Sequence, residues 1–209
     1  MSKYDESFRE ILSIDRDCIS DLLQTLDMKV MDEIVDLLCT VKQNSKKVIT
    51  AGCGTSGIAA QKIAHILNAV EVPSFFISPA NSIHGGMGAI QKGDVVVLLT
   101  RGGSTKEILN YIPVCKAKGA IIIGVTEKPD SVLGKNCDIL LKVVVQRESD
   151  PWNLIASGSI MAVLATWDAI SFTVMQHNGL TKEDFYLTHP GGSAGEKLAE
   201  MMNSAKQDG

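Results

Sequence analysis

The chain has 209 residues, of which 45% are hydrophobic and 21% charged, and its formal net charge is −4. This length and composition are typical of one globular domain that buries a sizeable core, with room for an added helical arm. The acidic balance offers no excess of basic side chains to the phosphates of a nucleic acid, so we expect no nucleic-acid partner.

The cysteines and the N-terminus indicate a cytoplasmic protein. The five cysteines are scattered without metal or disulfide spacing, which is typical of a reducing compartment. The N-terminal residues carry charges of both signs and lack an apolar signal core. The most apolar stretch, residues 155–175, is interrupted by hydroxyl side chains. It therefore favours a buried helix over a membrane span, and we expect no membrane partner.

Two amphipathic helices are predicted at the start of the chain. Apolar residues recur at three- and four-residue steps from Phe8 to Leu26 and again from Met31 to Val41, with a break near Asp27. Together they form an N-terminal helical arm, residues 1–45. The arm must bury its apolar stripe either on its own domain or on another subunit, and the pattern leaves both open.

The core that follows, residues 46–209, alternates apolar runs with helical segments. The predicted strands are residues 47–51, 73–78, 94–100, 120–126 and 138–145. The predicted helices run from Ser56 to about Ala69, over 104–118, near 131–135 and from about 154 to 177. Strands rich in Val and Ile on both faces and separated by helices predict an α/β fold, a five-stranded parallel sheet covered by helices on both faces.

Two turns rich in glycine and hydroxyl groups follow the first and third predicted strands. They read Gly52-Cys-Gly-Thr-Ser-Gly57 and Thr100-Arg-Gly-Gly-Ser-Thr105. Backbone amides and the positive end of a helix dipole favour an anion at such a turn. Ligands of open parallel sheets bind beyond the carboxyl ends of the strands, so the loops after the first three strands are expected to form the site. Two such turns at one edge predict a shared phosphate.

Each turn also has a purely structural interpretation. A glycine-rich corner can connect a strand to a helix without any ligand. Ser104 and Glu107 have the spacing of a capping box, which satisfies two amides at a helix start. Arg101 can pair with a phosphate or lie solvated in its loop.

These turns resemble those of the sugar isomerase (SIS) domain, a phosphosugar-binding, flavodoxin-like α/β fold. Ser82-Ile-His-Gly-Gly-Met-Gly88 is similar to the family's His-Gly segment, and Arg147-Glu-Ser-Asp-Pro151 to its Glu-x-x-Pro element. Thr188-His-Pro-Gly-Gly-Ser-Ala-Gly195 resembles the His-Pro-Gly-Gly signature of the arabinose 5-phosphate isomerase branch. The resemblance covers residues 7–198 and implies a single SIS domain over residues 1–209, without the pair of CBS domains usual in that branch.

The resemblance also implies a site, residue by residue. The implied substrate- and phosphate-binding residues are Gly54, Thr55, Ser56, Thr100, Arg101, Ser104 and Thr105, and the implied catalytic residues are His84, Glu148 and His189. The branch typically has Lys in place of Thr55 and Glu in place of Ser104. At Thr55 the chain instead resembles the Gly-Thr-Ser turn of glucosamine-6-phosphate synthase isomerase domains.

The residue types fit aldose–ketose isomerisation. That reaction needs a base for the proton beside a carbonyl, a polar partner for the enediolate and an acid or base for ring opening. Glu148 or His189 is the expected base and His84 the group that assists ring opening or proton shuttling, with no metal or cofactor. Glu148 lies in a charged stretch, so a solvated role is an alternative.

Three functions remain open at this point. The leading prediction is a sugar-phosphate isomerase that forms a homodimer or homotetramer, in which a histidine reaches the neighbouring site. The second is a non-catalytic phosphosugar-binding module. The third is a dinucleotide-binding protein, because Gly52, Gly54 and Gly57 fit G-x-G-x-x-G. It is disfavoured because the second predicted strand ends in Phe75-Phe-Ile-Ser78 without the acidic residue that binds ribose.

Overall fold

The computed structural model describes residues 3–207 and contains one five-stranded sheet. Its strands are β1 (Val48–Gly52), β2 (Ser74–Phe76), β3 (Val95–Leu99), β4 (Ile121–Thr126) and β5 (Ile139–Lys142). They pair in parallel in the order β2-β1-β3-β4-β5, which confirms the predicted α/β fold. The strand order reverses between β1 and β3, whose register pairs Gly52 with Leu99. The two glycine-rich turns therefore start at the same level of the same sheet edge.

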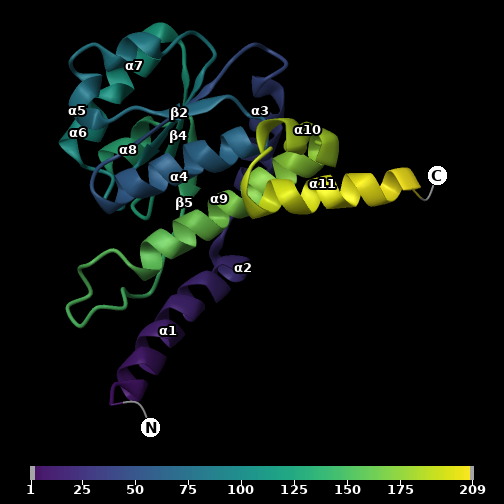
Figure 1. Cartoon of the computed structure of the whole chain (residues 1–209). Coiled ribbons are helices and arrows are strands. Elements are labelled where there is room, and N and C mark those ends of the chain that lie inside the picture. Colours follow the sequence, from purple (N-terminus) through teal and green to yellow (C-terminus); the bar gives the residue numbers. More distant parts are fainter. Residues whose placement is uncertain (1–2, 208–209) are drawn as a thin grey trace.

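Helices cover both faces of this sheet (Figure 1). The helices of eight or more residues are α1 (Asp5–Ser20), α3 (Met28–Val41), α4 (Thr55–Ala69), α7 (Tyr111–Lys118), α9 (Gly158–His177) and α11 (Gly192–Gln207). The shorter ones are α2 (Leu22–Thr25), α5 (Pro79–Ser82), η1 (Gly86–Ala89), α6 (Lys106–Leu109), α8 (Val132–Asn136) and α10 (Lys182–Thr188). Successive strand residues supply two separate cores because side chains alternate across a strand. Val95 and Val97 belong to the core under α3, α4 and α9, whereas Val96 and Leu98 belong to the core under α6, α7 and α8.

The helix predicted over residues 104–118 is in fact two helices, α6 and α7, with a break at Asn110. Pro113 explains the break. It has no N–H to donate to the carbonyl of Leu109, and its ring clashes with a carbonyl in that position of a continuous helix. The predicted end of this segment is confirmed, because Gly119 caps α7 in the left-handed conformation with φ +71°.

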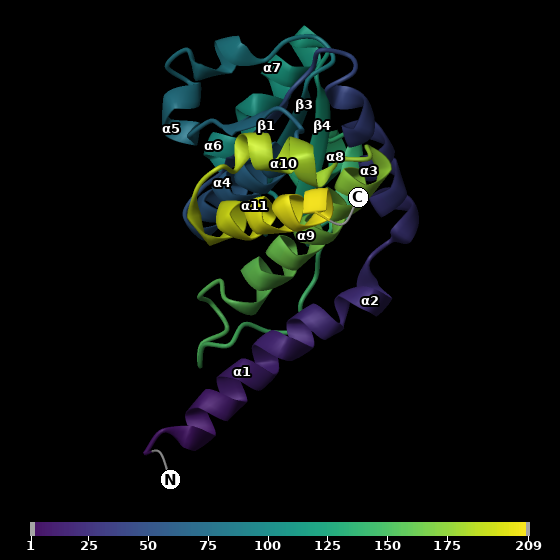
Figure 2. The ribbon, with the colours of Figure 1, turned by 45° about the vertical axis from the view of Figure 1, so that its right-hand side comes forward.

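The predicted helical arm comprises α1, α2 and α3. Asp27 begins α3 by accepting a hydrogen bond from the amide of Lys29, 2.9 Å away, so the predicted break lies there. Figure 2 shows α1 projecting from the body of the molecule beside the start of α9. Cys18 near the end of α1 and Leu22 at the start of α2 are buried, but Phe8 and Leu12 of α1 are 56% and 66% exposed. Within one copy the arm buries only part of its apolar stripe.

Helix α9 is long and apolar enough to cross a membrane by length and composition alone. It packs instead against α1, α3 and α4, with Trp167 and Ile170 fully buried in the core. An ion pair between Lys62 and Asp168 joins α4 to α9. Helix α9 is thus a helix of the protein core, as the sequence predicts, although Phe172 on its outer side is 45% exposed.

Candidate functional site

The first glycine-rich turn connects β1 directly to α4. Gly54 begins the helix with φ +56°, a conformation that side chains rarely adopt, and its carbonyl accepts the amide of Gly57 at 2.9 Å. Gly52 lies so close to the helix that a Cβ there would be 2.4 Å from the carbonyl oxygen of Ser56. The turn therefore depends on glycine, and it leaves Thr55 exposed and Ser56 partly buried at the positive end of α4.

The second turn lies beside the first and precedes α6. The hydroxyl oxygens of Thr100 and Thr105 are 2.7 Å apart and hydrogen-bonded. The N-cap of α6 is Thr105, and its side chain makes no capping hydrogen bond. Ser104 and Glu107 are exposed, so the capping box considered for them is not formed. Ser104 is thus available to a ligand at the end of β3.

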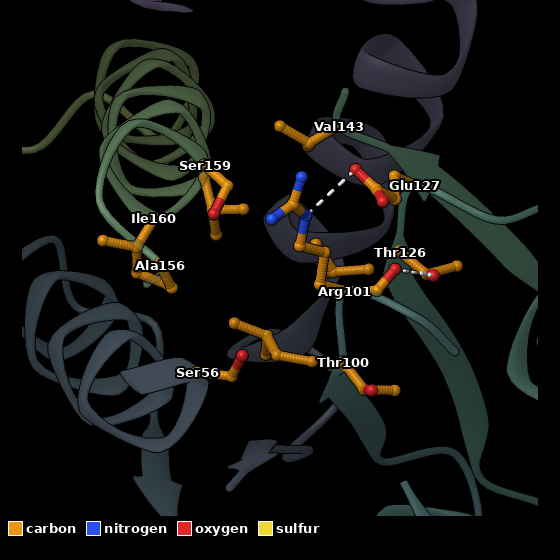
Figure 3. A pocket seen from close by; sticks show the side chains of 12 residues that line it. Ser56, Thr100, Arg101, Thr126, Glu127, Val143, Ala156, Ser159 and Ile160 are labelled. Carbon is orange, nitrogen blue, oxygen red and sulfur yellow. Dashed lines mark hydrogen bonds and ion pairs between the residues drawn. The ribbon is translucent and has the colours of Figure 1, made fainter. Parts of the chain in front are cut away.

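A small cavity of about 40 Å³ lies between the two turns and the start of α9. Its polar lining consists of Ser56, Thr100, Arg101, Thr126, Glu127 and Ser159. Figure 3 shows the guanidinium of Arg101 in the middle of this cavity, between Ser159 and Glu127, with Ser56 and Thr100 on the side of the turns. The structure therefore brings Ser56, Thr100 and Arg101 of the predicted phosphate site together.

Glu148 is fully buried, so the alternative that it is solvated is wrong. Its Oε2 accepts hydrogen bonds from the amides of Ser157 and Ser159 at 2.9 and 3.0 Å, where α9 begins. Its own amide donates to Oδ1 of Asn153 at 2.6 Å. Burial by itself raises the pKa of the Glu148 carboxyl, but hydrogen bonds from Ser159 and Ser157 and the charge of Arg101 together hold the pKa below its ordinary value. The ionised form of the buried Glu148 carboxylate is therefore favoured.

Arg101 links two carboxylates. Its Nη1 lies 2.6 Å from Oε1 of Glu148 and its Nε lies 3.1 Å from Oε2 of Glu127. Sequence reasoning missed Glu127, because it considered only the loops after the first three strands. The available signal was its place directly after β4, whose carboxyl end lies at the same sheet edge as the two turns.

The two predicted catalytic histidines lie outside this cavity. His84 lies in an exposed position between α5 and η1. His189 follows α10, stacks on the ring of Phe185 with 3.9 Å between centroids, and lines an apolar cavity of about 500 Å³ together with His65. His65 lies nine positions after Ser56 in α4, which is about 14 Å of helix at about 1.5 Å per residue. Within one copy of the chain, neither His84 nor His189 is among the residues that line the cavity around Arg101.

A metal site is not formed by the described part of the chain, where no three His, Cys, Asp or Glu side chains cluster closely enough to hold an ion. The arrangement offers instead a phosphate-type cradle, one arginine and a buried carboxylate. These groups can bind an anion and move a proton.

Comparison with known proteins identifies the fold. The model of the SIS domain matches residues 43–175. The arabinose 5-phosphate isomerase KdsD of Pseudomonas aeruginosa is 35% identical over 92% of this chain and 58% of its own length. KdsD of Escherichia coli K12 is 32% identical over 99% of this chain and 62% of its own length. The chain thus spans less than two thirds of these curated relatives.

Two solved structures resemble the chain over 91% of its length. A putative sugar-phosphate isomerase from Listeria monocytogenes has a TM-score of 0.88 and 39% identity, covering 91% of this chain and 100% of that one. An Escherichia coli CFT073 protein in complex with arabinose 5-phosphate has a TM-score of 0.85 and 29% identity, covering 91% and 100%.

Proposed function

Because the chain belongs to the SIS domain family, we propose that it interconverts the aldose and ketose forms of a sugar phosphate through an enediol intermediate. The observation that carries this proposal is the meeting of two glycine-rich turns and a buried carboxylate paired with Arg101 at the point where the strand order reverses. Ligands of open parallel sheets bind at this point, and a carboxylate there is placed to act as a base.

In this proposal the two turns hold the phosphate. The amides and hydroxyls of Gly54, Thr55 and Ser56 contact it from the start of α4, and Thr100, Arg101, Ser104 and Thr105 contact it from the end of β3. Hydroxyl groups, amides and one guanidinium are the donors that phosphate oxygens require.

Glu148 is the proposed base for the carbon-bound proton. Its Oε2 is held by the amide of Ser157, while its Oε1 accepts a hydrogen bond from Arg101, which lines the cavity. His189 and His84 are the proposed groups for proton transfer to the oxygen atoms and for ring opening. No metal or other cofactor takes part in this scheme.

A pentose 5-phosphate is the first substrate to test. The curated relatives above are named arabinose 5-phosphate isomerases. We propose arabinose 5-phosphate as a substrate of this chain on the basis of that similarity. Thr55 and Ser104 are neutral where the branch typically has Lys and Glu. A hexose phosphate is therefore the second substrate to test.

We further propose that the chain acts as a homodimer or homotetramer in which His189 or His84 reaches the cavity of a neighbour. Asp150 holds the loop after Glu148 in shape by accepting the amides of Trp152, Leu154 and Ile155 at 2.8–2.9 Å. That loop exposes apolar side chains, with Leu154 77% exposed. The hydrogen bond from Ser149 to Asp15 of α1 places the loop beside the exposed stripe of the arm. A second copy would cover this surface.

The division into an arm of residues 1–45 and a core of residues 46–209 within a single SIS domain stays a prediction. A cytoplasmic location also stays a proposal. It is supported by the five cysteines, all of which are free.

The activity is tested by hydrogen exchange. The protein is incubated in deuterated water with arabinose 5-phosphate, other pentose phosphates and hexose phosphates, and deuterium at C1 and C2 is followed by NMR. Glu148→Gln should abolish exchange, and Asp32→Asn, the same change in charge at an exposed position of α3, serves as the control. Absence of exchange with every sugar phosphate would refute the enzymatic proposal.

The assembly is tested by complementation. Glu148→Gln and His189→Ala are each expected to be inactive alone. Mixed dimers of the two contain one intact composite site, so an equal mixture should recover about a quarter of wild-type turnover. A monomeric mass in light scattering, or no recovery on mixing, would contradict a shared site.

One observation favours a second function, a phosphosugar-binding module without turnover. Nη1 of Arg101 lies 2.6 Å from Oε1 of Glu148, where a substrate carbon would have to approach, and the volume of the cavity is only about 40 Å³. This alternative predicts thermal stabilisation by sugar phosphates without deuterium uptake. Deuterium uptake that is lost in Glu148→Gln would rule it out.

A further inference from the structure

The cavity lined by Arg101 and the two turns is too small to hold the proposed sugar phosphate. Its volume is about 40 Å³, whereas pockets that hold small ligands usually measure about 300–1,000 Å³. The guanidinium of Arg101 lies in the centre of this space (Figure 3). A sugar phosphate can enter only if this side chain moves.

The two oxygens of Glu148 have different roles in this arrangement. Oε2 is fixed by the amides of Ser157 and Ser159, and the hydroxyl of Ser157 lies 3.2 Å from it. Oε1 faces Nη1 of Arg101 at 2.6 Å. Each carboxylate oxygen has two lone pairs. While Arg101 lies against Oε1, however, its guanidinium takes the space that a sugar carbon would need, and its positive charge lowers the pKa of the carboxyl.

The backbone of Arg101 is held by hydrogen bonds, whereas its side chain is partly exposed and can rotate. Its carbonyl accepts hydrogen bonds from the hydroxyl of Thr126 at 2.7 Å and from the amide of Glu127 at 3.1 Å. Its side chain is 35% exposed, whereas that of Glu148 is fully buried. Glu127, through Nε, retains the guanidinium in the site when the contact of Nη1 with Glu148 breaks.

We propose that Arg101 is a plug that the phosphate of the substrate displaces. In the free protein it pairs with Glu148 and closes the cavity. In the complex Nε keeps its contact with Glu127, Nη1 turns from Glu148 to the phosphate, and the sugar occupies the space that Nη1 has left. This inference rests on the proposed function and adds to it a specificity role for Arg101.

The exchange of partners is chemically reasonable. A phosphate monoester carries up to two negative charges and offers oxygens at the spacing of the guanidinium fork, so it competes well with one carboxylate. The unphosphorylated sugar has no group that can draw Arg101 from Glu148. Arg101 therefore makes opening of the cavity depend on the phosphate, and the closed form lowers the apparent affinity of every ligand.

The experiment measures binding of a pentitol 5-phosphate, which lacks a carbonyl and cannot react. Calorimetry compares wild type, Glu148→Gln and Glu107→Gln. Glu107 is exposed at the start of α6, so its variant makes the same change in net charge near the second turn without touching Arg101. Glu148→Gln removes the competing charge and should tighten binding about tenfold, because a hydrogen bond between charged groups no longer has to break. Glu107→Gln should change affinity by less than about twofold.

Each outcome decides the inference. Binding to Glu148→Gln that is no tighter than to Glu107→Gln would overturn it. A crystal structure of the wild-type complex gives the same decision without any variant, because Nη1 of Arg101 should contact the phosphate and lie beyond hydrogen-bonding distance of Glu148. A complex in which Arg101 still pairs with Glu148 refutes the plug and leaves the proposed function standing. Failure of all forms to bind refutes the proposed function together with the plug.

Discussion

Replacement of Gly52 by alanine should strongly destabilise the protein. The new Cβ would lie 2.4 Å from the carbonyl oxygen of Ser56, 2.6 Å from its carbonyl carbon and 2.9 Å from the amide nitrogen of Gly57. All three atoms are backbone, so no side chain can rotate away, and β1 must separate from the first turn of α4. Overpacking of a core costs about 1–3 kcal/mol, and this rigid contact belongs at the upper end.

A loss of about 3 kcal/mol corresponds to a decrease in Tm of roughly 6–12 °C for a chain of this size. Thermal unfolding followed by circular dichroism at one fixed protein concentration measures it. Gly88→Ala is the matched control, since nothing lies within 4 Å of a Cβ there. A Tm for Gly52→Ala equal to that of Gly88→Ala would refute the reasoning from close approach.

Three smaller effects follow from other contacts. Ser131→Ala should destabilise by about 1 kcal/mol in urea unfolding, because the Ser131 hydroxyl caps α8 by accepting the amide of Gly134 at 3.1 Å. Asp168→Asn should cost under about 1 kcal/mol, because both partners of its ion pair with Lys62 are over a third exposed, and the loss should vanish near 1 M salt. The native pKa of Glu148 lies below its ordinary value of 4.5, so its ionised form contributes stability that is present above that value and is lost as the pH falls through the native pKa. The stability difference between wild type and Glu148→Gln should therefore shrink on acidification; a constant difference between neutral and acid pH would contradict this.

The sheet was predictable from sequence because its three central strands, β1, β3 and β4, are buried on both faces. Runs of Val and Ile mark these strands directly. Four of the observed strands lie inside the predicted segments, and β1 ends one residue later than predicted, at Gly52. The prediction of one continuous helix over residues 104–118 was wrong, because the apolar pattern of the sequence continues through the break at Asn110. Pro113 was the available signal, because a proline inside a helix leaves the carbonyl four residues before it without a donor and so predicts a break near that position.

The site was predictable only in part, for a geometric reason. Parallel strands bring their carboxyl ends to one edge, so Ser56 and Thr100 could be expected to meet from the strand pattern alone. Glu148 is different, because its partners come from the loop after β3 and from the start of α9. The burial of a charged residue by tertiary contacts leaves no periodic signal. His84 lies exposed in a loop and His189 directly after α10, so no strand or helix period places either of them relative to the cavity.

The contrast between the two tryptophans gives the protein a pair of internal optical probes. Trp167 is fully buried, and its Nε1 has no hydrogen-bond partner within residues 3–207. Trp152 is 71% exposed in the loop that follows Glu148. Emission from Trp167 should be blue-shifted and resistant to iodide, and it should report melting of the core. Emission from Trp152 should be red-shifted and readily quenched, so a variant that keeps Trp152 alone would reveal whether ligand or a second copy covers the loop, at concentrations far below those needed for crystals.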